Sequence, residues 1–364
     1  MNPLNKLSSF GQSIWLDLLN RDIMDSGKLK QLIDMDDLRG MTSNPSIFEK
    51  AITGSTDYDD DIVMHSDATT DNTEIFFDLA VSDIQRAADI FRPVFDKTHG
   101  SDGFVSLEVA PGLAKDTQGT IHQARALWKR VNRKNVMIKI PGTREGIPAI
   151  RQCLSEGINI NVTLLFGLPR YREITEAFMG GLEDRLKAGH PIDHVSSVAS
   201  FFLSRIDVMT DPLLKEKNAD NLVGKIAIAS AREAYQIYLH MINSDRFRKL
   251  QSQGAQKQRV LWASTSTKDP AFSDVLYVES LIGKDTINTL PMETIDAFRD
   301  HGKVKETLTI NLNESGNYLK GLKDSGIDID IITQKLEDEG IEKFNHAFAA
   351  LLKSIDDKKN KVIE

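Results

Sequence analysis

The sequence predicts a single α/β domain with the (β/α)8, or TIM-barrel, fold over residues 1–364. Short apolar runs alternate with longer amphipathic stretches along almost the whole chain, and there are eight such runs. Alternation of this kind predicts right-handed βαβ units, and eight of them suffice to close a barrel. A doubly wound open sheet is the rival arrangement, but no G-x-G-x-x-G or P-loop pattern follows any of the runs.

The eight runs are the predicted strands. Most are nearly continuous in apolar residues, as expected for parallel strands that are covered on both faces. The first is also compatible with the start of a helix. In chain order the runs are Ser13–Leu18, Leu38–Thr42, Phe104–Val109, Val136–Ile140, Ile160–Phe166, Val195–Phe202, Arg259–Ala263 and Thr286–Leu290.

Helical periodicity fills the segments between the runs, and two of these segments are longer than a simple barrel requires. They are Gly167–His194, after the fifth run, and Asp207–Gln258, after the sixth, which carries its own helix around Ile226–Ile242. A last helix has its apolar face from Ile341 to Ile355 and precedes a charged tail, Asp356–Glu364. Whether the second insertion packs outside the barrel or shapes its cleft stays open.

Composition limits the classes of function. With 45 Lys+Arg against 53 Asp+Glu the net charge is -8, which argues against a general nucleic-acid binder but allows a local basic pocket. The single cysteine, Cys153, excludes an internal disulfide and zinc ribbons, and Pro191 weakens a helical metal site at His190 and His194. No run approaches the ~20 apolar residues of a membrane helix, and the N-terminus lacks a signal-peptide core. We therefore expect a cytoplasmic protein without metal, cofactor, nucleic-acid or membrane partner.

Polar residues interrupt the apolar runs near their C-terminal ends. They are Asp17 in the first run, Glu108 in the third, Lys139 in the fourth, and Asn161 and Thr163 in the fifth. Taken singly, each could be a cap or a solvated edge residue. In a barrel, however, the carboxyl ends of the strands meet at the mouth where active sites form. Because burying an isolated charge costs several kcal/mol or more, the ionisable groups need one another, and we expect one polar cluster.

This set of residues suits Schiff-base chemistry. A lysine held in apolar surroundings loses proton affinity, and its neutral amine can attack a ketone to form an iminium. The iminium is an electron sink for cleavage of the adjacent C–C bond, which also requires a group that moves the proton of the substrate hydroxyl. Asp17 and Glu108 are suitable residue types for that step, while Asn and Thr side chains can hold hydroxyls and a water.

Three segments resemble the transaldolase family. They are Thr42-Ser43-Asn44-Pro45-Ser46, the run from Val136 to Thr143 that contains Lys139, and the run from Gly157 to Phe166 that contains Asn161 and Thr163. The resemblance follows strand order from Asp17 to about Arg205, weakens afterwards, and is to the longer bacterial form. It implies an enzyme of the non-oxidative pentose phosphate pathway that moves a dihydroxyacetone unit from sedoheptulose 7-phosphate to glyceraldehyde 3-phosphate. Members are often dimers, so a homodimer is one expected assembly.

The resemblance also implies residue roles. Lys139 would form the Schiff base, and Asp17 would be the general acid/base of C–C cleavage. Glu108 and Thr163 would hold the water that is used in forming and dehydrating the carbinolamine. The residues expected around the dihydroxyacetone moiety are Thr42, Asn44 and Asn161.

The phosphate end matches the family less closely. Ser200, Phe202 and Arg205 resemble its serine, aromatic residue and first phosphate arginine. The segment after the seventh run lacks the second arginine and reads Ala263-Ser264-Thr265-Ser266-Thr267-Lys268. We expect Lys268 to supply the missing charge, since an ammonium binds phosphate as a point charge. The alternative is that Lys268 is a surface residue and that Arg205 acts alone or with Ser200.

Two other functions remain open. A fructose-6-phosphate-type aldolase would use the same lysine but release free dihydroxyacetone. Such aldolases are much shorter and look to have a tyrosine where Asp17 stands, so Asp17 favours transfer. A non-catalytic barrel that senses sugar phosphates would keep the pocket without a covalent intermediate.

Overall fold

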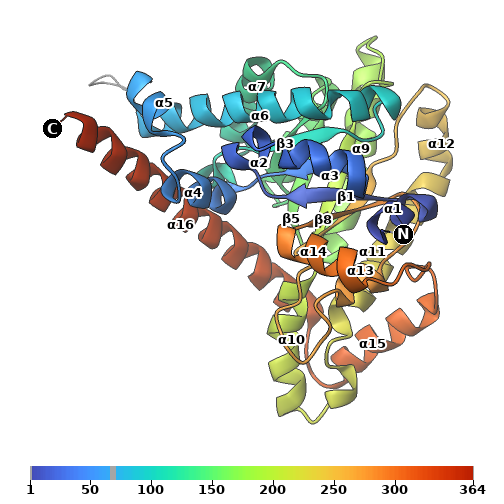
Figure 1. The fold of residues 1–364 in the computed structure, drawn as a ribbon. Coiled ribbons are helices and arrows are strands. Elements are labelled where there is room, and N and C mark those ends of the chain that lie inside the picture. The colour runs from blue at the N-terminus through green and yellow to red at the C-terminus, as the bar shows by residue number, and fades with distance from the viewer. Residues whose placement is uncertain (1, 66–70, 364) are drawn as a thin grey trace.

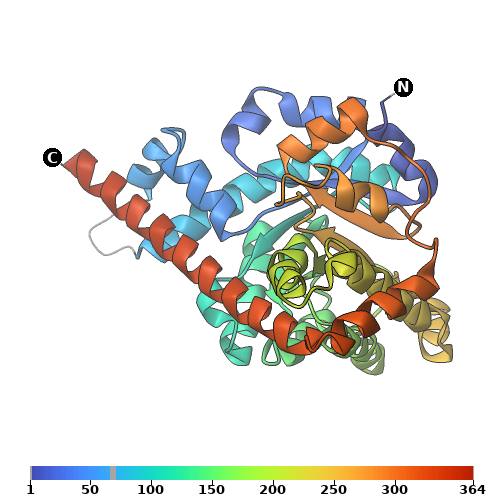
Figure 2. The ribbon, with the colours of Figure 1, turned by 90° about the horizontal axis from the view of Figure 1, so that it is seen from below.

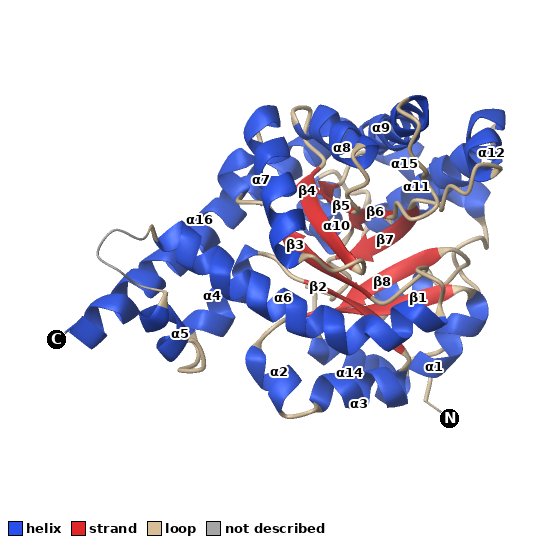
Figure 3. Cartoon of the chain, turned by 90° about the horizontal axis from the view of Figure 1, so that it is seen from above, coloured by secondary structure: helices blue, strands red, loops and turns tan. Residues whose placement is uncertain are grey.

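The computed structural model describes residues 2–65 and 71–363. Eight parallel strands pair in chain order, and the last pairs with the first, so the sheet is a closed barrel (Figures 1 and 3). This confirms the predicted (β/α)8 fold. The strands are β1 Gln12–Asp17, β2 Leu38–Thr42, β3 Phe104–Glu108, β4 Val136–Pro141, β5 Ile160–Leu165, β6 Ser197–Phe202, β7 Arg259–Ala263 and β8 Thr286–Leu290.

The strand boundaries follow the apolar runs closely because burial on both faces selects apolar residues. The ambiguous first run is a strand, β1, and not the start of a helix. The sixth strand begins two residues later than predicted, at Ser197, because Val195 belongs to a turn in which its N–H donates to the carbonyl of Ile192 (3.2 Å).

Helices surround the barrel in Figure 3. They are α1 Leu4–Leu7, α2 Arg21–Asp25, α3 Lys28–Asp36, α4 Pro45–Thr53, α5 Asp59–Met64, α6 Asn72–Lys97, α7 Thr117–Val131, α8 Gly146–Ser155, α9 Leu168–Lys187, α10 Ser204–Glu216, α11 Ile226–Asn243, α12 Asp245–Gln251, α13 Leu276–Ser280, α14 Met292–His301, α15 Leu312–Asp324 and α16 Ile329–Ile363. The first predicted insertion is α9, and the second contains most of α10 together with α11 and α12. In the described part of the chain, no helix combines the length and apolar character that a membrane crossing needs.

The last helix is longer than the sequence predicted. α16 runs from Ile329 to Ile363 and includes residues 356–363 of the expected charged tail, whose last residue, Glu364, lies outside the described residues. Its charged end is attached to the rest of the protein, since Lys358 forms an ion pair with Asp59 and donates to the carbonyl of Ser55 (2.8 Å). In Figures 1 and 2 the helix extends from the neighbourhood of α10 to α4 and α5, and it contacts all three.

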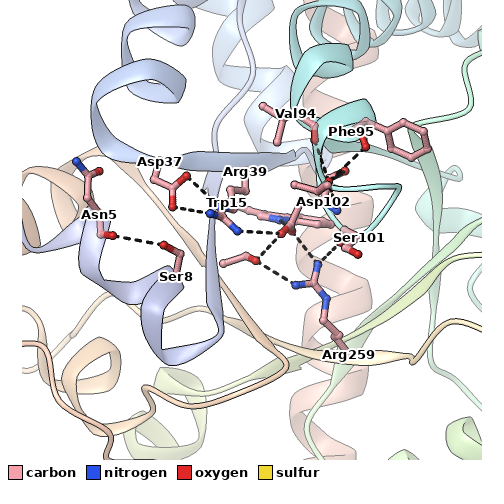
Figure 4. Close-up of polar contacts among 12 residues, drawn as sticks. Asn5, Ser8, Trp15, Asp37, Arg39, Val94, Phe95, Ser101, Asp102 and Arg259 are labelled. Atoms are coloured by element: carbon pink, nitrogen blue, oxygen red, sulfur yellow. Dashed lines mark hydrogen bonds and ion pairs between the residues drawn. The ribbon is translucent and has the colours of Figure 1, made fainter.

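A buried carboxylate lies at the N-terminal end of the barrel (Figure 4). Asp102, which is 3% exposed, accepts hydrogen bonds from Ser13 Oγ (2.7 Å), Trp15 Nε1 (3.2 Å) and Arg259 Nη2 (2.8 Å). These partners belong to β1 and β7, whereas Asp102 precedes β3. One side chain therefore joins the starts of three strands.

We expect Asp102→Ala to lower the free energy of unfolding by about 3–5 kcal/mol, because it leaves the guanidinium of Arg259 without its buried partner. Urea denaturation measures this loss. The matched control is Asp89→Ala, since Asp89 pairs with Arg133 at the surface and such pairs contribute up to about 1 kcal/mol. Equal losses in the two variants would show that the hydrogen bonds of Asp102 contribute no more than a surface ion pair.

Candidate active site

Lys139 lies at the C-terminal end of the barrel, paired with a carboxylate. Its Nζ is 3.0 Å from Glu108 Oε2 and donates to the carbonyl oxygen of Ser43 (2.9 Å). The two charged residues are 4% and 5% exposed. β3 and β4 pair in a register that places Glu108 opposite Lys139, so their side chains leave the sheet on the same face. The strand register thus produces the predicted pairing of the two charges.

Asp17, the last residue of β1, completes the charged group. Its Oδ1 accepts a hydrogen bond from Thr42 Oγ1 (2.7 Å), and this hydroxyl lies 2.8 Å from Thr289 Oγ1. Burial raises the pKa of Asp17, and the positive charge of Lys139 opposes that rise. Burial also raises the pKa of Glu108, again opposed by Lys139. Two carboxyl groups with increased proton affinity therefore share this end of the barrel with one lysine.

A cavity of about 330 Å³ opens above this group, at the carboxyl ends of the strands. This volume lies within the range typical of small-molecule sites. Nine of the eleven residues proposed from the sequence line it: Asp17, Thr42, Asn44, Lys139, Thr163, Ser200, Phe202, Arg205 and Lys268. Within residues 2–65 and 71–363, no three histidine, cysteine or carboxylate side chains are grouped as they would be around a metal ion.

The other two proposed residues lie behind the cavity wall. Glu108 does not line the cavity itself but pairs with Lys139, which does. Asn161 is fully buried, its Nδ2 donates to Ser106 Oγ (3.1 Å), and its Oδ1 accepts from Ser200 Oγ (2.7 Å). The structure therefore places Ser200, rather than Asn161, on the wall, with Asn161 holding the serine hydroxyl.

Asn44 has a local structural role beside the cavity. It is the N-cap of α4, and its Oδ1 accepts from the backbone N–H of Ile47 (3.0 Å). Pro45 follows at the first helical position, where its missing N–H has no cost. The segment from Thr42 to Ser46 is thus a strand end, a cap and a helix start, and it leaves the amide nitrogen of Asn44 as the group available to a ligand.

The family model for transaldolase/fructose-6-phosphate aldolase matches residues 14–355. The chain belongs to this family. The transaldolase of Trichodesmium erythraeum is 47% identical over 99% of this chain and 98% of its own length. Transaldolase 2 of a Nostoc species (strain PCC 7120) is 46% identical over 98% of both chains. The transaldolase of Acidothermus cellulolyticus is 44% identical over 97% of this chain and 96% of its own.

Two cations, Arg205 and Lys268, line the cavity of this member of the transaldolase/fructose-6-phosphate aldolase family. Arg205, the second residue of α10, is half-buried, and its Nη1 has no hydrogen-bond partner in the described part of the chain. Lys268 is exposed at the rim, where its Nζ donates to Ser266 Oγ (2.5 Å). Lys268 is therefore a surface residue that also lines the cavity, and its role in phosphate binding stays a prediction.

Several cavity residues of this family member were not predicted. Lys50 of α4 and Glu293 of α14 line the cavity, and the negative charge of Glu293 contributes to the raised pKa of Asp17. Glu293 follows the end of β8 by three residues, which is a signal that could have identified it. The sequence could not identify Phe344 of α16 as a cavity residue, because an aromatic residue on the apolar face of a helix is also typical of the core.

α16 reaches the cavity through a close approach to β5. Leu164, in the irregular part of this strand, has a φ of 58°, and its Cδ2 would lie 3.0 Å from a Cβ at Gly340. A leucine rarely adopts a positive φ, and backbone strain of this kind is concentrated at functional sites. The glycine thus allows α16 to lie against the strand that carries Thr163, and Phe344 follows one helical turn later.

Proposed function

We propose that this chain is a transaldolase that transfers a dihydroxyacetone unit from sedoheptulose 7-phosphate to glyceraldehyde 3-phosphate, giving erythrose 4-phosphate and fructose 6-phosphate. The observation that carries the proposal is a buried lysine between two carboxyl groups on the floor of a cavity with cations at its rim. Buried amines that can lose their proton are suited to attack a ketone carbonyl. The relatives, which match this chain over nearly their whole length, are named transaldolases, and this agrees with the proposed chemistry.

Schiff-base formation begins with attack of the neutral Lys139 amine on C2 of the ketose. The resulting carbinolamine loses its hydroxyl as water once that oxygen has received a proton, and the iminium remains. Glu108, 3.0 Å from Nζ, is placed to take the proton from nitrogen and pass it on. Glu108 Oε1 and the Thr163 hydroxyl are buried and have no hydrogen-bond partner in the described residues, so they are the groups we assign to the water.

C–C cleavage then requires a base for the C4 hydroxyl. We assign this role to Asp17, which accepts that proton while the C3–C4 bond breaks and its electron pair moves to the iminium nitrogen. The aldose phosphate leaves, and a neutral enamine stays on Lys139. In the second half-reaction the enamine attacks the aldehyde carbon of glyceraldehyde 3-phosphate, and Asp17 returns the proton to the new hydroxyl. A raised pKa suits a group that must both accept and donate this proton.

The distal phosphate is assigned to Arg205 and Lys268. Arg205 lines the cavity, and its guanidinium can donate a hydrogen bond to a phosphate oxygen there. Lys268 adds a second positive charge at the rim. The carbohydrate end then reaches the floor at Lys139, with the Asn44 amide as a donor and the Ser200 oxygen as an acceptor for its hydroxyls.

A fructose-6-phosphate aldolase is the second candidate, because the matching family model covers both activities. The two differ in whether the enamine waits for an acceptor or is protonated and hydrolysed. The experiment supplies fructose 6-phosphate with and without erythrose 4-phosphate and measures sedoheptulose 7-phosphate and free dihydroxyacetone. We expect turnover to depend on the acceptor. Equal release of dihydroxyacetone without acceptor would instead identify an aldolase.

A further inference from the structure

The segment between β7 and α13 carries Lys268, and α10 holds the start of that segment. The N–H groups of Leu203 and Ser204 donate to the carbonyls of Ala263 and Ser264 (both 3.0 Å), and the two serine hydroxyls lie 2.9 Å apart. Arg205 is the next residue of α10. The backbone that presents Arg205 is therefore bonded directly to the backbone that leads to Lys268.

A buried carboxylate of the same helix holds the other end of the segment. Asp207, which is 3% exposed, accepts a hydrogen bond from the Tyr277 hydroxyl of α13 (2.8 Å) and from the backbone N–H of Ala227 in α11 (2.8 Å). No described residue forms an ion pair with Asp207, and burial raises its pKa to about 6. A buried carboxylate without a cation depends on its hydrogen-bond donors, so Tyr277 and the start of α11 are held firmly against it.

The middle of the segment rests on the loop between α10 and α11. Gly224, with a φ of 70°, donates its N–H to Asp211 Oδ1 (3.0 Å), one helical turn after Asp207. A Cβ at Gly224 would lie 2.6 Å from the ring of Phe272, so the aromatic side chain packs directly on this glycine. The inner face of α10 thus supports the Lys268 segment at three places.

We propose that Asp207 is a positioning residue which, through Tyr277, holds Lys268 beside Arg205 at the phosphate end of the cavity. The exposed Lys268 side chain has Ser266 as its hydrogen-bond partner, so its location depends on the backbone of its segment. That backbone is tied to the helix that presents Arg205, which fixes the spacing of the two cations. The insertion from Asp207 to Gln258 then shapes the cleft, because α10 and α11 supply the contacts. This inference rests on the proposed function, in which the two cations bind the substrate phosphate.

Tyr277→Phe tests the inference, since it removes one hydroxyl and keeps the ring. We expect the KM for fructose 6-phosphate to rise about three- to tenfold, the equivalent of one lost hydrogen bond, with kcat changed less than about twofold. The KM for D-fructose, which lacks the phosphate, stays unchanged. Tyr235→Phe is the matched control, because the Tyr235 hydroxyl of α11 donates to the carbonyl of Lys284 (3.0 Å), outside this segment. Circular dichroism establishes that both variants fold.

A double variant separates positioning from a general structural effect. If Tyr277 acts through Lys268, Tyr277→Phe combined with Lys268→Ala raises KM no more than Lys268→Ala alone. Additive increases would overturn the inference. If Lys268→Ala raises KM while Tyr277→Phe behaves like Tyr235→Phe, the positioning role is wrong and the phosphate assignment stands. If Lys268→Ala leaves KM unchanged, the phosphate assignment of the proposed function fails and the inference fails with it.

Discussion

Replacing Lys139 by alanine is expected to abolish transfer while the barrel stays folded. Lys139 provides the amine between Asp17 and Glu108, so without it neither the iminium nor the enamine forms. We expect kcat/KM to fall on the order of 10⁴-fold or more, which corresponds to at least about 5 kcal/mol of lost transition-state stabilisation. Glu108 loses its positive partner, so the pKa of this carboxyl, which burial already raises, rises further in the variant. Circular dichroism establishes that the fold is retained.

Borohydride trapping identifies the lysine directly. Reduction in the presence of fructose 6-phosphate should leave a stable adduct on the peptide that contains Lys139, and peptide mass mapping locates it. Lys50→Ala is the control, because Lys50 is another amine that lines the cavity and its removal should leave the adduct in place. An adduct on a different lysine would reassign the chemistry. No adduct at all on the unaltered chain would favour a non-catalytic sugar-phosphate-binding barrel.

Asp17→Asn is expected to separate Schiff-base formation from cleavage. The amide keeps the size of the side chain and can still contact Thr42, but it cannot accept the proton of the C4 hydroxyl. We expect cleavage to slow by about 10²–10⁴-fold, as is typical when a general base is removed, while borohydride still traps an adduct on Lys139. A single-turnover measurement of trapped adduct against released aldose phosphate checks this. Normal cleavage by the variant would refute the assigned role.

The pH dependence of cleavage provides a companion test for Asp17. Asp17 acts in its ionised form, so activity falls as the pH drops through the apparent pKa values of the coupled Asp17–Glu108 pair. Because the negative charge of Glu293 contributes to the raised pKa of Asp17, Glu293→Gln should shift this loss of activity, the acid limb of the pH profile, to lower pH. Asp300→Asn, on the same helix but outside the cavity, should leave the limb in place. An unmoved limb in both variants would show that Glu293 does not act on Asp17.

Most of the barrel and the floor of the site could be predicted because both depend on local patterns. Apolar runs mark strands that are buried on both faces, and a polar residue near the end of such a run is costly unless it has a partner. Parallel strands in a closed barrel end at one mouth, which is sufficient to bring Asp17, Glu108 and Lys139 together. Even the unmatched Lys268 could be placed near the mouth, because it follows β7 by five residues.

Long-range contacts decided the rest. Side-chain alternation predicts that Asn161 points into the barrel, and its hydrogen bonds to Ser106 and Ser200 agree with this, but only the structure shows that it lies outside the lining of the cavity. The role that we propose for the 207–258 insertion likewise rests on a long-range contact, the hydrogen bond between Asp207 and Tyr277, 70 residues apart.

The sequence by itself determined the strand order, the (β/α)8 class and the lysine with its two carboxylates, because periodicity and the cost of buried charge act within single strands. Only the tertiary structure decided that Phe344 of α16 reaches the cavity and that the backbone leading to Lys268 is bonded to the start of α10. These features arise from packing between elements distant in the chain. Such packing depends on shape and on individual hydrogen bonds, which leave no periodic trace in the sequence.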